Sequence, residues 1–265
     1  MTSQGAIPPI AARIAQTVGR IPGVVAVSLG GSTASGFADE DSDLDFHVFW
    51  AAPLASPAER EAILRPIADA GSLIVRPGEA SWTLEDWLVV EGQPVELIYV
   101  AWRDVETDVA WAYAHGLTDD EFTTARLHTY AHGHALHDPS GALGAIQARL
   151  NQAYPAATRD LLLRREPGRL ELAMKQLRTA QGRGDLLFVQ HRRYTVQSIF
   201  FNLLFALNRR YHPGEKRLLQ HAERCPIRPA DLAERWEYIA LLPADDMTLD
   251  YFLSEQVAEL CALVR

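Results

Sequence analysis

The residues of this sequence best suited to chemistry form two short groups, a glycine turn and a pair of carboxylates. Gly30, Gly31 and Ser32 follow an apolar stretch, and Asp43 and Asp45 come shortly after them. Glycines let backbone amides approach an anion closely, and Ser32 adds a hydroxyl donor, so the turn could hold phosphate groups. Carboxylates bind hard cations such as Mg²⁺, which neutralise phosphates. Either group alone is common in turns and solvated loops, but their occurrence together favours phosphate chemistry.

The strand pattern of residues 44–50 places these acids. Side chains alternate between the faces of a strand, so Asp43, Asp45 and His47 share one face, and the two aspartates lie roughly 7 Å apart at the backbone. That spacing allows them to share metal ions. We expect His47 to be a packed or solvent-edge residue rather than a metal ligand. A further acid, Glu96, is isolated in the apolar stretch 95–100, where packing explains its charge poorly.

The run from Gly30-Gly31-Ser32 to Asp43-Leu44-Asp45-Phe46 resembles the signature of the polymerase-beta-like nucleotidyltransferase superfamily. Within it, the chain looks most like the bacterial two-domain group of aminoglycoside and lincosamide nucleotidyltransferases, over about residues 20–100. The resemblance implies Mg²⁺-dependent transfer of a nucleoside monophosphate, AMP from ATP, to a hydroxyl of a small-molecule acceptor, with release of pyrophosphate.

The resemblance also assigns roles to residues. It implies that Gly31 and Ser32 bind the nucleotide, that Asp43 and Asp45 are catalytic and hold Mg²⁺, and that Glu96 is the third catalytic carboxylate. Glu96 would be either a metal ligand or the base that deprotonates the acceptor hydroxyl.

In the helical half of related enzymes a basic residue reaches the triphosphate. The resemblance makes Lys216 the candidate for this role. Four other basic residues on the predicted helices are alternatives: Lys175, Arg178, Arg192 and Arg193.

The composition of the chain limits the classes of partner that it could bind. The chain has 265 residues, 48% of them hydrophobic, and a formal net charge of -9. Proteins that hold long nucleic acids need a broad basic surface, so a polynucleotide partner such as tRNA is disfavoured, and a cationic or neutral small acceptor suits the charge better. Two cysteines are too few for a disulfide framework, and the sequence shows no secretory signal or membrane span, so we expect a soluble cytoplasmic protein. Two alternatives remain open: transfer of AMP to a protein side chain, and a nucleotide-binding protein of the same fold without turnover.

The first half of the chain has the pattern of an α+β domain. Helices are predicted over residues 10–18 and from Ser56-Pro57 onward, where Glu59 lies in the first turn. Strands are predicted over three further segments, the last of them a hairpin: residues 24–29, 44–50, and 87–90 with 95–100. The acids Asp39, Glu40 and Asp41 are expected in an exposed loop. For the tryptophans Trp82, Trp87, Trp102 and Trp111 we expect packing in the core or at its edge.

The second half has a helical pattern. The histidines between residues 128 and 137 predict a hairpin, and the turn at 138–141 follows it. Beyond that turn, apolar residues recur at helical spacing over 196–207, in a helix expected to end near Tyr211. Two further helices are predicted, over about 230–241 and over 249–264. We therefore predict an α+β fold with a mixed-sheet nucleotidyltransferase domain, residues 1–150, followed by a helical bundle domain, residues 151–265.

Overall fold

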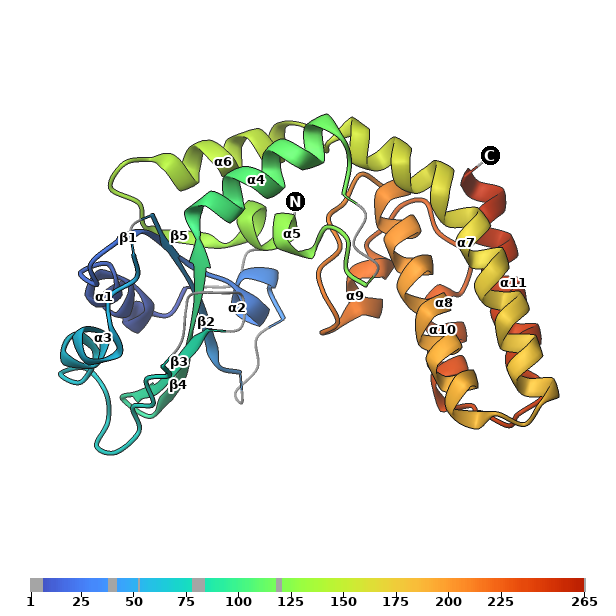
Figure 1. Ribbon diagram of the computed structural model, residues 1–265, viewed down its shortest axis with the longest axis horizontal. Helices are drawn as coiled ribbons and strands as arrows, with labels where there is room; N and C mark the ends of the chain where they lie inside the picture. The colour runs from blue at the N-terminus through green and yellow to red at the C-terminus, as the bar shows by residue number, and fades with distance from the viewer. Residues whose placement is uncertain (1–6, 38–41, 52, 78–83, 118–120, 265) are drawn as a thin grey trace. The chain divides into compact units, whose positions relative to one another are not determined.

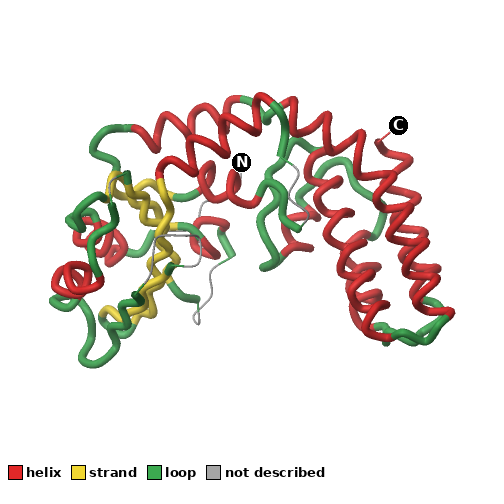
Figure 2. The backbone as a smooth tube through the Cα atoms, viewed as in Figure 1, coloured by secondary structure: helices red, strands yellow, loops and turns green. Residues whose placement is uncertain are grey.

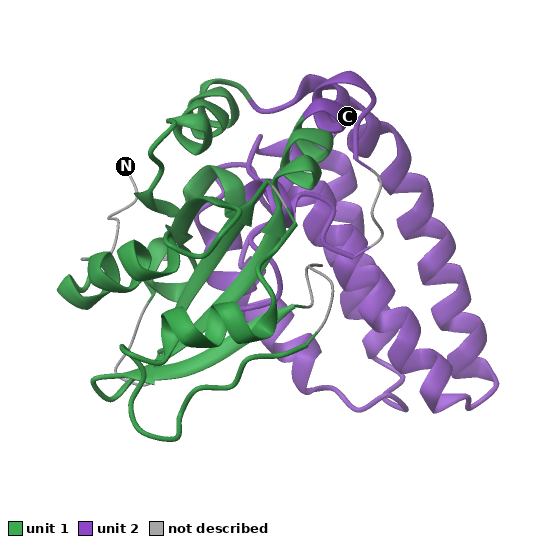
Figure 3. Ribbon diagram, turned by 60° about the vertical axis from the view of Figure 1, so that its left-hand side comes forward, with its two compact units in different colours: residues 1–109, 129–153 green, residues 110–128, 154–265 purple. Residues whose placement is uncertain are grey.

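The protein divides into two compact units. A computed structural model describes residues 7–37, 42–51, 53–77, 84–117 and 121–264. Residues 1–109 and 129–153 form unit 1, and residues 110–128 and 154–265 form unit 2 (Figure 3). The chain therefore passes between the units three times, and residues 110–128, which precede the predicted boundary at residue 150, group with unit 2. The acids Asp39, Glu40 and Asp41, and also Trp82, lie outside the described residues.

Unit 1 is built on a mixed five-stranded sheet (Figures 1 and 2). Its strands lie in the order β3-β4-β2-β1-β5. Strands β2 and β4 pair in parallel, and the other neighbours are antiparallel. The strands are β1 Val24–Leu29, β2 Leu44–Trp50, β3 Glu85–Val90, β4 Gln93–Ala101 and β5 His134–His137. The predicted strands and the hairpin are thus confirmed, and the fold is α+β.

One face of this sheet carries the core of unit 1. Alternate residues of the central strands point into it and are fully buried, among them Leu29, Phe46 and Leu97. Helices α1 Pro9–Val18 and α3 Pro57–Leu64 lie on the same side of the sheet (Figure 1). Helix α3 begins as predicted, because the Ser56 hydroxyl accepts the backbone N–H of Glu59 and the Glu59 carboxylate accepts the backbone N–H of Ser56. The other helices of this part are α2 Gly31–Ser35, α4 Trp102–Ala114, α5 Ala125–His132 and α6 Ala142–Gln152.

A buried ion pair lies on the core side of the sheet. The Nε of Arg60 donates to Oδ2 of Asp86 at 2.9 Å, and the two side chains are 1% and 0% exposed. The Tyr99 hydroxyl also donates to Oδ2 of Asp86, at 2.8 Å, and burial, the charge of Asp86 and this hydrogen bond together raise the pKa of Tyr99. Arg60 donates further to the carbonyl oxygens of Ala55 and Arg76. Both charges are therefore compensated by hydrogen bonds as well as by each other.

Removing one partner of this ion pair should destabilise the protein strongly. Arg60→Met leaves the Asp86 carboxylate buried without its cation, so we expect the free energy of unfolding to fall by about 3–5 kcal/mol in urea titrations. Arg13→Met is the matched control, because Arg13 pairs with Glu91 at 2.6 Å on the surface, with side chains 52% and 65% exposed. Exposed pairs contribute about 0–1 kcal/mol. Equal losses in the two variants would contradict this prediction.

Unit 2 is helical. Its five helices beyond residue 153 are α7 Ala156–Gly182, α8 Leu186–Leu207, α9 Leu218–Glu223, α10 Leu232–Leu241 and α11 Leu249–Val264. Helix α8 is its central element, with Phe200 and Phe201 buried against Trp236 of α10 at centroid distances of 4.9 and 5.1 Å. None of the described helices is long and apolar enough to cross a membrane.

The segment 110–128 is tied into unit 2 by hydrogen bonds. The Thr158 hydroxyl of α7 donates to the carbonyl of Ala112 at 2.8 Å. The Asn202 side chain of α8 accepts the backbone N–H of Thr123 at 3.1 Å. Each of these polar groups is buried and finds its partner in a residue distant in sequence, which explains why the segment belongs to this unit.

Two predictions about this half of the chain were wrong in detail. Helix α8 ends at Leu207 rather than near Tyr211, because Arg209 adopts a left-handed conformation, φ 51°, that a helix cannot continue through. The predicted histidine hairpin is instead helix α5 followed by strand β5, which pairs with β1. The reason lies in Leu127, Tyr130 and Ala131, which are buried at helical spacing on α5.

Candidate active site

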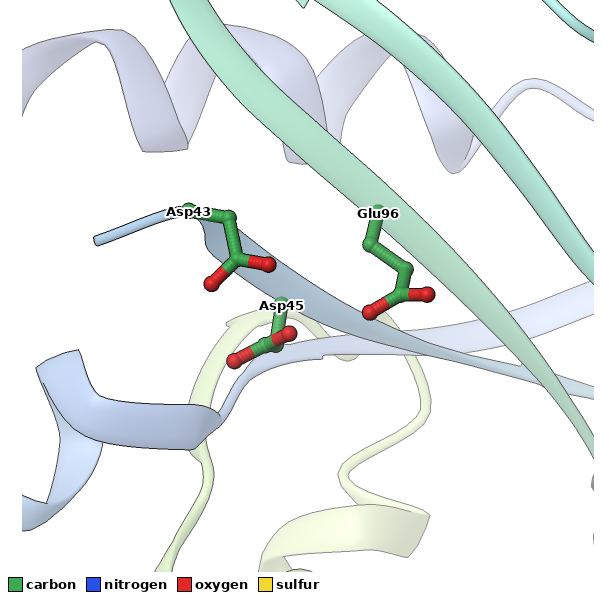
Figure 4. Close-up of side chains that lie close together, drawn as sticks. All are labelled: Asp43, Asp45 and Glu96. Atoms are coloured by element: carbon green, nitrogen blue, oxygen red, sulfur yellow. The ribbon is translucent and has the colours of Figure 1, made fainter. Parts of the chain in front are cut away.

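The carboxylates predicted for the site lie together on one face of the sheet. Strands β2 and β4 pair so that Asp45 stands directly opposite Glu96, and Asp43 precedes β2 by one residue. One oxygen from each of the three carboxylates lies within 4.8 Å of the others (Figure 4). Among the described residues no other group of three His, Cys, Asp or Glu side chains is placed in this way.

The three acids differ in exposure. Asp45 is only 8% exposed, whereas Asp43 and Glu96 are half-buried. Figure 4 shows one oxygen of Glu96 on the side of the aspartates and the other on the opposite side. Like charges held this close repel one another, and a cation between them would relieve the repulsion. The cluster therefore has the donor chemistry of a divalent metal site.

The glycine turn touches the same cluster. The backbone N–H of Gly30 donates to the carbonyl oxygen of Asp45 at 2.8 Å. Gly31 follows with φ +60°, and a Cβ built on it would lie 1.7 Å from Oδ2 of Asp45. Only a residue without a side chain fits there, because both the backbone conformation and the space favour glycine. Helix α2 starts at Gly31, and Ser32 in its first turn is half-buried.

The ring of His47 packs directly against Gly30. A Cβ on Gly30 would lie 2.6 Å from Cε1 of His47. His47 is 7% exposed, and burial lowers its pKa to about 4, so the ring is neutral at pH 7. His47 is therefore packed against the glycine turn.

Two residues beside the cluster were not singled out as site residues from the sequence. The indole Nε1–H of Trp87, on β3, donates to Oε1 of Glu96 at 2.8 Å. Glu85, two residues earlier on the same face, has its pKa raised, first by burial and then by the charge of Glu96 and a hydrogen bond with it, while Arg76 lowers it. Unit 1 thus carries a fourth carboxylate next to Glu96.

The turn of the hairpin between β3 and β4 is the sequence signal that places Trp87 and Glu85 beside the cluster. Glu91 and Gly92 both have positive φ, 54° and 80°, which is typical of a two-residue hairpin turn. A turn of that length fixes the register, and Trp87 then falls directly opposite Glu96. The predicted strands 87–90 and 95–100 leave a four-residue connection, and a connection of that length does not define the register.

Lys216 belongs to unit 2. It is exposed, in the turn before α9. Three of the four alternatives have partners within unit 2: Arg178 binds Asp250 and Ser254, Arg192 binds Gln176, and Arg193 binds two backbone carbonyls. The fourth, Lys175, is exposed. A role for Lys216 in binding the triphosphate stays a prediction.

Comparison with known proteins gives one family match and a set of structural matches. The model of a domain of unknown function, DUF4037, matches residues 120–218. No curated protein matches the chain. Eleven chains of solved structures do. Among them is the nucleotidyltransferase-like protein from Exiguobacterium sibiricum 255-15, with 13% sequence identity and a TM-score of 0.46, over 96% of this chain and 73% of that one. The family match does not include Asp43, Asp45 or Glu96.

Proposed function

We propose that this protein is a magnesium-dependent nucleotidyltransferase. It would transfer a nucleoside monophosphate, AMP from ATP, to a hydroxyl of a small-molecule acceptor and release pyrophosphate. The observation that supports this most is the convergence of Asp43, Asp45 and Glu96, from two paired strands, next to a glycine turn.

The side chains fit the metal that this reaction needs. Mg²⁺ prefers carboxylate oxygens, and Asp43 and Asp45 would hold it, with Glu96 within reach as a third ligand. When bound there, Mg²⁺ would neutralise the phosphates and stabilise the charge that develops as pyrophosphate leaves.

The glycine turn would hold the nucleotide. Backbone amides at Gly31 and Ser32, with the Ser32 hydroxyl, can donate hydrogen bonds to the phosphate oxygens. Because Gly31 has no side chain, the Asp45 carboxylate lies directly against the turn, so a metal ion held by that carboxylate would be close to phosphates bound at the turn. Lys216 would add a positive charge to the triphosphate from the helical half.

Glu96 would act on the acceptor. Its carboxylate takes the proton of the acceptor hydroxyl, whose oxygen then forms a bond to the α-phosphorus. The bond between that phosphorus and the bridging oxygen breaks, and the oxygen leaves as part of pyrophosphate with the electron pair. The net charge of -9 suits an acceptor that is cationic or neutral rather than a polyanion.

The test is a transfer assay with α-labelled nucleoside triphosphates and a panel of small hydroxyl compounds. We expect Mg²⁺-dependent labelling of an acceptor and release of pyrophosphate by the wild-type chain. Glu96→Gln should lose turnover by about 100-fold or more yet retain ATP binding, because Gln keeps the shape of Glu but cannot take the proton. A large loss of metal affinity in this variant would make Glu96 a ligand instead of the base. Label on a protein partner rather than on a small compound would change the acceptor class, and no pyrophosphate release under any condition would refute the function.

A further inference from the structure

Trp87 contacts the carboxylate cluster from outside it, beside Glu85 on β3. Its indole N–H is a donor only, and it is hydrogen-bonded to Oε1 of Glu96 at 2.8 Å. Because β3 and β4 place the two residues directly opposite each other, the bond follows from the strand register. The bond occupies one of the two oxygens of Glu96 and restricts rotation of the carboxylate.

The indole is itself held in place. The guanidinium carbon of Arg76 lies 4.1 Å from the centroid of the Trp87 ring, a cation–π distance. The backbone of Trp87 also exchanges two hydrogen bonds with Ile74, at 2.7 and 3.0 Å. A side chain fixed on its ring face and at its backbone can hold a hydrogen-bond partner with little loss of entropy.

The buried ion pair fixes Arg76 in turn. The backbone N–H of Arg76 donates to Oδ1 of Asp86 at 3.0 Å, and its carbonyl accepts from Nη2 of Arg60 at 2.6 Å. The pair on the core side of the sheet therefore anchors the segment whose guanidinium covers Trp87. Contacts run without a break from Asp86 through Arg76 and Trp87 to Glu96.

We propose that Trp87 is a positioning residue for Glu96. Its N–H holds one oxygen of that carboxylate and so limits the orientations in which Glu96 can meet a metal ion or an acceptor hydroxyl. This inference rests on the proposed transfer reaction, and it adds a residue outside the glycine turn and the three acids. Outer partners of this kind typically contribute 10- to 100-fold to the activity or metal affinity of the group they orient.

The test combines kinetics with an observation that needs no turnover. Trp87→Phe keeps the ring under Arg76 but removes the N–H. We expect kcat to fall about 10-fold while KM for the nucleotide stays within about two-fold, because binding of the phosphates does not involve Trp87. In the Glu96→Gln background the same substitution should have almost no further effect, since Trp87 acts only through Glu96.

The hydrogen bond can be followed directly by NMR. The chain has six tryptophans, so its ¹H–¹⁵N spectrum contains six indole N–H signals, and Trp87→Phe identifies one of them by its loss. Glu96→Gln should move that signal and leave the rest in place. Trp102→Phe is the matched control, because Trp102 donates to Glu106 at 3.1 Å on α4, an indole–carboxylate bond that is not part of the cluster.

Each outcome decides the inference. It is overturned if Glu96→Gln leaves the Trp87 signal in place, or if kcat of Trp87→Phe equals that of Trp102→Phe. It is also overturned if the effects of Trp87→Phe and Glu96→Gln on kcat are additive. In all these cases loss of turnover in Glu96→Gln alone still supports the proposed function. A wild-type chain without any transfer activity contradicts both.

Discussion

Asp43→Asn and Asp45→Asn should each reduce Mg²⁺-dependent transfer by about 1,000-fold or more. Asn keeps the size of Asp and one of its oxygens but removes the negative charge that a divalent cation needs. Ligand oxygens of both residues lie within 4.8 Å of each other and of one from Glu96, so either substitution weakens the whole set. The measurement is the rate of pyrophosphate release as a function of Mg²⁺ concentration, together with Mn²⁺ binding by calorimetry.

The control for this pair is an aspartate outside the cluster. Asp104 lies on α4 and pairs with Arg103 at 3.6 Å, so Asp104→Asn should keep nearly wild-type activity. All three variants should unfold cooperatively, because none of them breaks a contact of the apolar core. Retention of full activity in Asp43→Asn and Asp45→Asn would mean that the catalytic centre lies elsewhere.

Gly31→Ala should have the second largest effect. The new Cβ would lie 1.7 Å from Oδ2 of Asp45, a distance no real contact allows, so the carboxylate or the turn must move. A displacement of about 1 Å in a catalytic group can cost roughly 100-fold in rate, and we expect a loss of that size in kcat/KM. Mn²⁺ affinity should fall as well, because the residue displaced is a proposed ligand.

Gly92→Ala is the control that distinguishes the steric clash with Asp45 from the backbone strain of a positive φ. Gly92 has φ +80°, so alanine there is strained as it is at Gly31, but a Cβ would meet no atom within 4 Å. Gly92→Ala should lose roughly 1 kcal/mol of stability for the left-handed conformation, and Gly31→Ala should lose at least as much, because the displaced carboxylate adds to the same backbone strain. Only Gly31→Ala should lose activity. Equal activity in the two variants would show that the contact between the turn and Asp45 has no part in the reaction.

Local patterns made most of unit 1 predictable. Strand alternation placed Asp43 and Asp45 on one face, and the isolated charge of Glu96 marked it as unusual, because both arguments need only neighbouring residues. The start of α3 was visible in Ser56 and Glu59 for the same reason. The grouping of the three acids required one more fact, the parallel pairing of β2 with β4, which no local pattern contains.

What the sequence missed depends on register and on distant partners. Trp87 and Glu85 join the site only because a two-residue turn sets the hairpin register. The placement of residues 110–128 depends on Thr158 and Asn202, which are buried polar groups 41 residues or more away from the atoms they bind. Hydrophobic periodicity carries no information about such pairs, since it reports which face of an element is buried and not against what.

The three passages of the chain between its units limit how this protein can evolve by recombination. Neither unit is a continuous stretch of sequence, so a crossover near residue 150 would bring in a foreign second half and leave residues 110–128 behind without Thr158 and Asn202. The backbone carbonyl of Ala112 and the backbone N–H of Thr123 would then lose their hydrogen-bond partners, so the hybrid protein would contain unpaired buried polar atoms. A foreign second half could therefore replace unit 2 only if residues 110–128 were exchanged together with it.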